Sequence, residues 1–190
     1  FKGNILTNIS PNLIAQIGVS RTFQNLALFK RMSVLDNILV GRRLHTKANF
    51  LQIAFQLRRA RDEEEQNRNK CEELIEFLEI EDIRDTPVGK LPYGLQKKVE
   101  LGRALATEAE VLLLDEPMAG MNVEEKREMC RFILKVNDEI GTTMVLIEHD
   151  MGVVMDISDN VVVLDYGKII ADGTPDEVRS NQEVIDAYLG

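Results

Sequence analysis

The sequence lacks a long hydrophobic run, and no stretch approaches the roughly 18 uninterrupted apolar residues that a membrane-spanning helix needs. That absence excludes insertion into a bilayer but not docking onto a membrane protein. Basic residues are outnumbered, with 23 Lys and Arg against 32 Asp and Glu and a net charge of −9. A protein that binds nucleic acids in general would carry an excess or a cluster of basic residues, so we expect no nucleic-acid partner.

Cysteine and histidine are scarce as well. Cys71 and Cys130 lie far apart without C-x-x-C spacing, which favours reduced thiols over a disulfide or a zinc site. His45 and His149 are the only histidines, too few for a His-rich metal site. No charged n-region precedes an apolar h-region, so we recognise no secretion signal. Because the chain starts with Phe1 rather than Met, we expect that an N-terminal portion is absent.

What is present is typical of one globular domain: 190 residues, 44% of them hydrophobic and 29% charged. Apolar runs at 111–114, 142–147 and 161–164 predict strands that are buried on both faces of a parallel sheet. A helix over 123–140 separates the first two runs, and the region from 34 to 106 reads as mostly helical. This order of elements predicts an α/β fold with its chemistry at the carboxyl ends of the strands.

Shorter signals complete the prediction of local structure. We expect a hairpin or edge strand at residues 1–5, a helical run after Ser10-Pro11, a strand from Val19, a tight turn at 165–168 that opens a hairpin, and a helix with a capping box from Thr174 to Glu177.

The segment from Arg58 to Glu73 is dense in both signs of charge. It can be read as an electrostatic contact surface or as a solvated helix with i,i+4 pairs, and we favour the helix.

Acidic and imidazole side chains follow two of the predicted strands. Asp115 and Glu116 come directly after the first apolar run, and His149 follows the second. An adjacent carboxylate pair after a hydrophobic strand suits nucleoside-triphosphate chemistry, since one carboxylate can help to hold Mg²⁺ while the other orients the attacking water. Acidic residues at strand ends are also common turn formers, so the combination within one α/β unit matters more than either site alone.

Five motifs in order resemble the ATP-binding subunits of ABC transporters. They are a Q-loop (Arg21-Thr22-Phe23-Gln24-Asn25), a signature motif (Leu91-Pro92-Tyr93-Gly94-Leu95-Gln96), a Walker B strand (Val111 to Pro117), a D-loop (Ala119-Gly120-Met121-Asn122) and an H-loop (Ile147-Glu148-His149-Asp150). The details of these motifs, together with the ending Ala187-Tyr188-Leu189-Gly190, are most similar to the ATPases of branched-chain amino-acid importers.

The resemblance implies a P-loop NTPase-like α/β fold with a mainly parallel sheet. Residues 1–190 would be a single truncated ABC ATPase domain that contains a helical subdomain at about 30–108 and lacks the N-terminal P-loop segment. The cofactors would be ATP and Mg²⁺. The partners would be a second ABC ATPase subunit, two transmembrane permease subunits and, indirectly, a solute-binding protein. The location would be peripheral, on the cytoplasmic side of the cell membrane.

Site roles also follow from the resemblance. Glu116 would be the general base or a carboxylate that orients the attacking water, and His149 would contact the γ-phosphate. Asp115 and Gln24 would support Mg²⁺, and Gln24 would couple the site to the membrane subunits. Residues expected at the subunit interface or at the partner's nucleotide are Pro92, Tyr93, Gly94, Gln96 and Asn122.

The sequence departs from the family pattern in two places. No Gly-x-x-x-x-Gly-Lys-Ser/Thr loop is present, so we expect no strong ATP binding by this chain alone and no ATPase activity of the fragment by itself. We also expect the fragment to be less stable than its parent or to be rearranged. The family usually has Ser at Pro92 and Gln at Leu95. Proline has neither the hydroxyl of serine nor a backbone N–H, so two potential phosphate donors are lost. Because the signature motif would complete the nucleotide site of the partner subunit, this loss predicts an asymmetric heterodimer with one degenerate site. Alternatively, the change is tolerated drift, since many groups share the stabilisation of the transition state.

Two other functions compete with the ATPase. A non-catalytic ABC-type scaffold or regulatory subunit is consistent with the missing P-loop and the altered signature. An ABC ATPase of nucleic-acid repair or translation is disfavoured by the acidic charge. The sequence upstream of Phe1 separates the first two, because a Gly-rich loop there would favour the enzyme.

Overall fold

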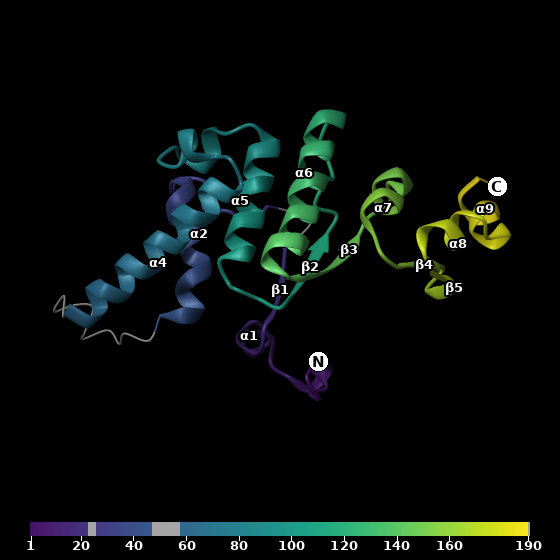
Figure 1. The fold of residues 1–190 in the computed structure, drawn as a ribbon, viewed down its shortest axis with the longest axis horizontal. Coiled ribbons are helices and arrows are strands. Elements are labelled where there is room, and N and C mark those ends of the chain that lie inside the picture. The colour runs from purple at the N-terminus through teal and green to yellow at the C-terminus, as the bar shows by residue number, and fades with distance from the viewer. Residues whose placement is uncertain (23–25, 47–57, 190) are drawn as a thin grey trace. The chain divides into compact units, whose positions relative to one another are not determined.

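A computed structural model describes residues 1–22, 26–46 and 58–189 of the chain. Two compact units, Phe1–Val145 and Leu146–Gly190, divide it. Strands and helices alternate, which confirms the predicted α/β fold (Figure 1). In chain order the elements are η1 (Leu6–Asn8), α1 (Pro11–Ile14), η2 (Ala15–Ile17), β1 (Val19–Arg21), α2 (Val34–Gly41), η3 (Arg42–His45), α4 (Arg58–Phe77), η4 (Glu81–Ile83), η5 (Val88–Lys90), α5 (Tyr93–Leu105), β2 (Val111–Asp115), α6 (Val123–Lys135), η6 (Val136–Ile140), β3 (Thr143–Ile147), α7 (Met151–Ile157), β4 (Val161–Asp165), β5 (Lys168–Gly173), α8 (Pro175–Arg179) and α9 (Gln182–Leu189).

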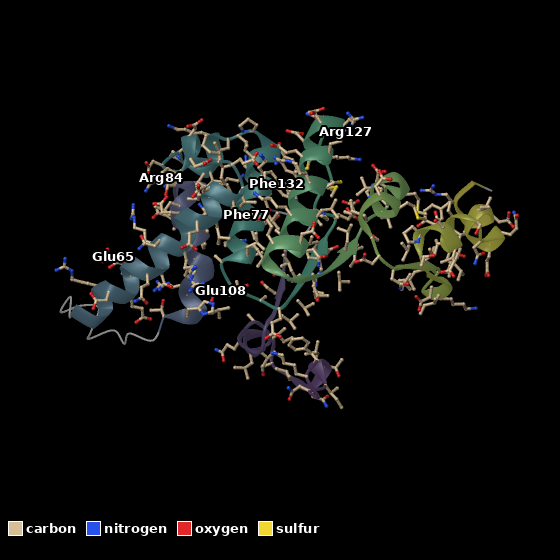
Figure 2. The ribbon with its side chains drawn as sticks, in the orientation of Figure 1. Glu65, Phe77, Arg84, Glu108, Arg127 and Phe132 are labelled. Atoms are coloured by element: carbon tan, nitrogen blue, oxygen red, sulfur yellow. The ribbon has the colours of Figure 1, made fainter. Side chains whose placement is uncertain are left out.

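The central sheet has the strand order β1-β2-β3. β1 and β2 are parallel, with Val19 opposite Val111 and Arg21 opposite Leu113. Side chains of α5, α6 and Leu114 of β2 line one small void, so both helices cover the same face of β2. From α6 the fully buried Phe132 side chain meets α5, where the Lys98 Nζ lies 4.7 Å from the ring centroid (Figure 2).

Helices α2, α4 and α5 pack against one another beside this sheet and confirm that the region from 34 to 106 is helical where the structure describes it. Arg42 joins them through three partners: its Nε donates to Asn67 Oδ1 at 3.0 Å, its NH1 donates to the Ala106 carbonyl at 3.1 Å, and NH1 pairs with Glu108 Oε1 at 2.8 Å. Cys71 is buried among these helices, and burial raises the pKa of its thiol to about 11.

The charged helix α4 behaves as a solvated surface over its described side chains. Arg68 pairs with Glu72 at i,i+4 and Lys70 pairs with Glu73 at i,i+3. Most side chains from 61 to 70 are exposed, and Asn67 is the buried exception. Exposed pairs of this kind contribute little each, so the interpretation as a solvated helix is the one the structure supports.

The third apolar run differs from its prediction. β4 pairs antiparallel with β5, Val161 opposite Gly173, and is not a strand of the parallel sheet. Burial on both faces is also wrong for β3 and β4, because Val145, Ile147, Val162 and Leu164 are 48 to 61% exposed. In the described second unit, residues of α7, α8 and α9 pack on the side of Val161 and Val163. Alternation along the strand then leaves Val162 and Leu164 on the opposite, exposed face.

The opening segment also differs from its prediction. Lys2 and Gly3 have φ values of 48° and 78°, and the Asn4 N–H donates to the Phe1 carbonyl at 2.8 Å. Two consecutive left-handed residues make a tight turn, not a strand. The segment continues into η1 and then into α1, which confirms the helical run after Ser10.

Three smaller predictions are confirmed. Tyr166 and Gly167 form the turn between β4 and β5, with positive φ at both residues. The Thr174 side chain accepts from the Glu177 N–H, and Pro175 follows it at the first helical position of α8. Gly141 ends the 123–140 helix in the left-handed conformation, after a final π-helical turn, η6.

Candidate functional site

The carboxyl edge of β1 and β2 brings Arg21, Thr22 and Asp115 together. The Arg21 NH2 pairs with Asp115 Oδ2 at 2.5 Å, and Thr22 Oγ1 accepts from the Asp115 N–H at 3.4 Å. The parallel register causes this meeting, because it places the ends of both strands at one edge of the sheet. Sequence reasoning assigned Arg21 no role of its own. Its position next to Asp115 follows from the strand pairing, which the sequence does not state.

Glu116 has an unusual backbone conformation directly after β2. Its φ is 45°, in the left-handed region, although the next residue is Pro117 and residues before proline favour extended conformations. Such strain is a pointer to function when it occurs at a candidate site. It is not unique to this position, because four other described non-glycine residues have positive φ: Lys2, Glu79, Glu108 and Tyr166. The strain therefore supports a special role for Glu116 only together with its place at the strand end.

The signature motif forms the start of α5. Pro92 is the residue before the helix and provides no side-chain cap, as its loss of a hydroxyl predicts. The Gln96 Nε2 donates back to the Leu91 carbonyl at 2.8 Å. Gly94 is buried in the first turn, where unpaired backbone N–H groups and the helix dipole favour an anion.

The D-loop lies against the signature motif within the same chain. A Cβ on Gly120 would lie 3.3 Å from the Tyr93 ring, and one on Gly94 would lie 2.5 Å from the Glu125 carboxylate. Asn122 caps α6, because its side chain accepts from the Glu125 N–H at 3.0 Å while Glu125 Oε2 accepts from the Asn122 N–H at 3.0 Å. The structure thus brings Tyr93, Gly94 and Asn122 together, and it adds Glu125, which the sequence analysis did not single out.

His149 lies in the second unit with a side chain that is 73% exposed. Its Nδ1 is 3.8 Å from Glu148 Oε2, and the Glu148 side chain is 2% exposed. Asp150 then caps α7 by accepting from the Val153 N–H at 3.4 Å. Since Glu116 belongs to the first unit and His149 to the second, their meeting at one rim of the sheet stays a prediction. Gln24 lies outside the described residues.

Comparison with known proteins decides the family. A profile described as ABC transporter matches residues 2–119, which is more than half of the chain. The chain belongs to the ABC transporter ATP-binding family. A second profile, branched-chain amino acid ATP-binding cassette transporter, matches residues 168–190 at the C-terminal end. This confirms the ABC ATPase resemblance on which the motif assignments depend.

Curated relatives and solved structures agree with this membership. The chain is 39% identical over 188 residues to the high-affinity branched-chain amino acid transport ATP-binding protein BraF of Pseudomonas aeruginosa, covering 99% of this chain and 74% of that protein. It is 36% identical over 185 residues to LivG of Escherichia coli, covering 97% of this chain and 72% of that protein.

An ATP-binding cassette solved in its ADP conformation superposes with a TM-score of 0.82 at 31% identity, covering 100% of this chain and 75% of that one. A nucleotide-free cassette gives a TM-score of 0.80, also at 31% identity, over 100% and 76%.

None of the described helices is both long enough and apolar enough to cross a bilayer.

Proposed function

We propose that this chain is the ATP-hydrolysing subunit of an importer of branched-chain amino acids, bound to the cytoplasmic side of the cell membrane. The observation that supports this most is the pair Asp115–Glu116 at the carboxyl edge of a parallel sheet, where Asp115 contacts Arg21 and Thr22 of the Q-loop motif. Ligands of doubly wound folds bind at this edge. The relatives named above carry branched-chain amino-acid transport in their names, which sets the proposed solute.

The residues at this edge fit Mg²⁺ bound together with a nucleotide. Mg²⁺ prefers oxygen ligands and is usually held by one or two carboxylates plus substrate phosphates. Asp115 offers such a carboxylate, 22% exposed, which in this structure neutralises Arg21. Among the described residues no group of three or more His, Cys, Asp or Glu could hold a metal ion alone. We assign the ion to Asp115 and Gln24; when bound, it supplies charge neutralisation for the phosphates of ATP.

The remaining residues act on the water and on the phosphates. Glu116 accepts the proton of the attacking water or orients it, and the strained turn after β2 sets its position. His149 donates to the γ-phosphate oxygens, next to the buried Glu148 carboxylate. Gln24 links this site to the permease. No phosphate-cradling Gly-rich loop occurs in the 190 residues, so tight ATP binding requires a P-loop outside them.

A second ABC ATPase subunit completes the proposed site. Pro92, Tyr93, Gly94 and Gln96, with Asn122 of the D-loop, would face the nucleotide of that subunit. Pro92 supplies neither a hydroxyl nor an N–H. This chain therefore stabilises the γ-phosphate bound by the partner less well than a chain with serine at position 92 would. The proposed assembly is therefore an asymmetric heterodimer on two permease subunits, loaded by a solute-binding protein.

The test is ATP hydrolysis and uptake by the protein purified with its permease subunits. In proteoliposomes, the wild type is expected to hydrolyse ATP and to take up labelled leucine, isoleucine or valine when the loaded binding protein is added. Glu116→Gln should lower kcat about 10²- to 10⁴-fold while ATP still binds, because the proton acceptor is lost. Glu124→Gln, in the exposed first turn of α6, is the matched control and should keep the rate. Wild-type hydrolysis by Glu116→Gln would contradict the proposed role.

A second candidate, a non-catalytic ABC-type subunit, is favoured by one specific observation. The signature motif carries proline where serine is usual, so it lacks that hydroxyl and backbone N–H for the phosphate of the partner's nucleotide. Calorimetry with Mg-ATP separates the two functions in the assembled protein. A scaffold would bind no nucleotide at this subunit's own site and would keep transport when Glu116 is replaced.

A further inference from the structure

A small void lies between α5, α6 and the carboxyl end of β2. Its lining includes Thr22, Lys97, Glu100, Leu114 and Pro117. The void offers about 10 Å³ to a water-sized sphere, which is roughly the room that one buried water molecule needs. Apolar voids stay dry, whereas a void with polar groups on its walls can hold water. The polar side chains of the lining therefore decide whether this void is filled.

Glu100, which lines this void, has an unpaired carboxylate oxygen. The residue is 3% exposed, and its Oε2 accepts from Lys97 Nζ at 3.3 Å. Its Oε1 is buried and has no hydrogen-bond partner within the part of the chain that the structure describes. Burial raises the pKa of Glu100, and the charge of Lys97 opposes that rise. Because a carboxylate loses its hydration on burial, Oε1 requires a donor in place of bulk water.

Thr22 lines the same void and has a hydroxyl hydrogen that requires an acceptor. The residue is 5% exposed, and its Oγ1 accepts from the Asp115 N–H at 3.4 Å. A hydroxyl can donate one hydrogen bond in addition to those that it accepts. Across residues 1–22, 26–46 and 58–189, no acceptor lies within reach of that hydrogen. A donor and an acceptor, both without partners, therefore line one void of the size of a water molecule.

We propose that this void binds one ordered water, which accepts a hydrogen bond from the Thr22 hydroxyl and donates one to Glu100 Oε1. Two polar partners are enough to hold a buried water. The water also fixes the rotation of the hydroxyl, so that a lone pair of Oγ1 faces the Asp115 N–H at the end of β2. The site does not depend on the proposed ATPase function, because all the groups that form it belong to the core of this chain.

The direct test is a crystal structure of the full-length protein at a resolution that shows ordered water. One solvent peak should lie within about 2.5–3.0 Å of both Thr22 Oγ1 and Glu100 Oε1, the usual range for O–H···O bonds. An empty void would overturn the proposal. A direct hydrogen bond between Thr22 and Glu100 that closes the void would also overturn it.

Removal of the charged lining should empty the site in solution. Lys97→Met with Glu100→Leu replaces the buried pair by apolar residues of similar size, a change that often leaves stability equal or higher. Magnetic relaxation dispersion of water counts long-lived buried waters, and this count should fall by about one per chain. Lys70→Met with Glu73→Leu is the matched control, because this pair on α4 has the same i,i+3 spacing but is exposed. An equal count in the buried variant and the wild type would contradict the proposal.

Substitutions of Thr22 test the other partner of the water. Thr22→Val keeps the shape of the side chain without the hydroxyl and should lose the water, whereas Thr22→Ser keeps the hydroxyl and should retain it. A water that persists in the valine variant would contradict the assignment.

Amide exchange reports the effect on Asp115. In the Lys97→Met/Glu100→Leu protein, where Thr22 is intact, exchange of the Asp115 N–H should accelerate about 2- to 10-fold, the equivalent of one weakened hydrogen bond. The acceleration is expected because the hydroxyl is then no longer held toward this N–H. Exchange at the wild-type rate would show that the water does not orient Thr22 and would overturn that part of the proposal.

Discussion

Pro92 is one of two residues, with Leu95, at which this signature motif departs from the usual family pattern. Its φ of −53° and ψ of 154° are those of a residue that caps a helix, but it has no oxygen to accept from the first-turn N–H groups of α5. The identity of this one side chain therefore affects both helix stability and the expected strength of the partner's site.

Pro92→Ser should be more stable than Pro92→Ala by about 1 kcal/mol, because only serine supplies the cap acceptor at a backbone geometry that already suits it. Urea unfolding of the two variants measures this difference. The alanine variant controls for loss of the proline ring, which by itself raises the entropy of the unfolded chain. In the assembled transporter, Pro92→Ser should also raise the ATPase rate. An unchanged rate would favour tolerated drift over an asymmetric site.

At the scale of elements, close helix contact and helix caps decide which substitutions the fold tolerates. α2 ends at Gly41, where an added Cβ would lie 2.2 Å from the Arg103 carbonyl oxygen of α5. The neighbour is backbone, so it cannot turn aside as a side chain would. α8 depends instead on its capping box, in which Thr174 and Glu177 exchange hydrogen bonds.

Gly41→Ala should lower the free energy of unfolding by about 1–3 kcal/mol, because the methyl group forces α2 and α5 apart. Gly152→Ala in α7 is the matched control, since its Cβ would meet only Asp150 Oδ1 at 3.4 Å, an ordinary contact. Helix propensity makes the control neutral or stabilising, by up to roughly 1 kcal/mol. Denaturant melts of both variants give the comparison, and equal stability would show that the helices can separate without cost.

Acid should weaken the α8 cap. The backbone N–H of Thr174, and then its hydroxyl, hold the pKa of Glu177 below its ordinary value of 4.5. A lowered carboxyl pKa in the folded state stabilises the fold above the ordinary pKa, and this contribution is lost as pH falls from 4.5 through the lowered value. Glu177→Gln should flatten this part of the pH dependence of Tm. Glu183→Gln in α9 is the control, and a profile of Glu177→Gln that matches the wild type would contradict the prediction.

At the scale of the whole molecule, each unit exposes apolar strand faces that its own described layers leave open. On the β4–β5 hairpin, Val162, Leu164 and Ile169 are 49%, 61% and 64% exposed. Contiguous apolar surface of this kind promotes association.

The purified chain should therefore self-associate, and Val162→Thr with Leu164→Thr should reduce this association because threonine keeps strand propensity and adds a hydroxyl. Light scattering at equal concentration measures the effect. Val163→Thr, which places the hydroxyl in the buried cluster with Val178 and Val184, is the opposite control and should destabilise the second unit. Unchanged association in the double variant would show that this face is not responsible.

Much of the fold was predictable because local chemistry specifies it. Leu112 and Leu114 are buried as their place in an apolar run predicts, and the caps at Thr174 and Gly141 follow from residue type alone. The errors at β3 and β4 have one physical origin. An apolar run such as 161–164 reports that its residues can be buried, but not which strand pairs with it or whether a layer covers both faces.

The candidate site divides in the same way. The order of Gln24, Gly94, Asp115, Glu116 and His149 along the chain identifies the family, because each motif is a local pattern of residue types. Only the tertiary structure decided which groups meet: Arg21 with Asp115 through the strand register, Glu125 with Gly94 through the packing of α6 on α5, and Arg103 with the Ala27 carbonyl. Those contacts join residues up to 94 positions apart, and their geometry depends on how helices and strands pack, which no local pattern encodes.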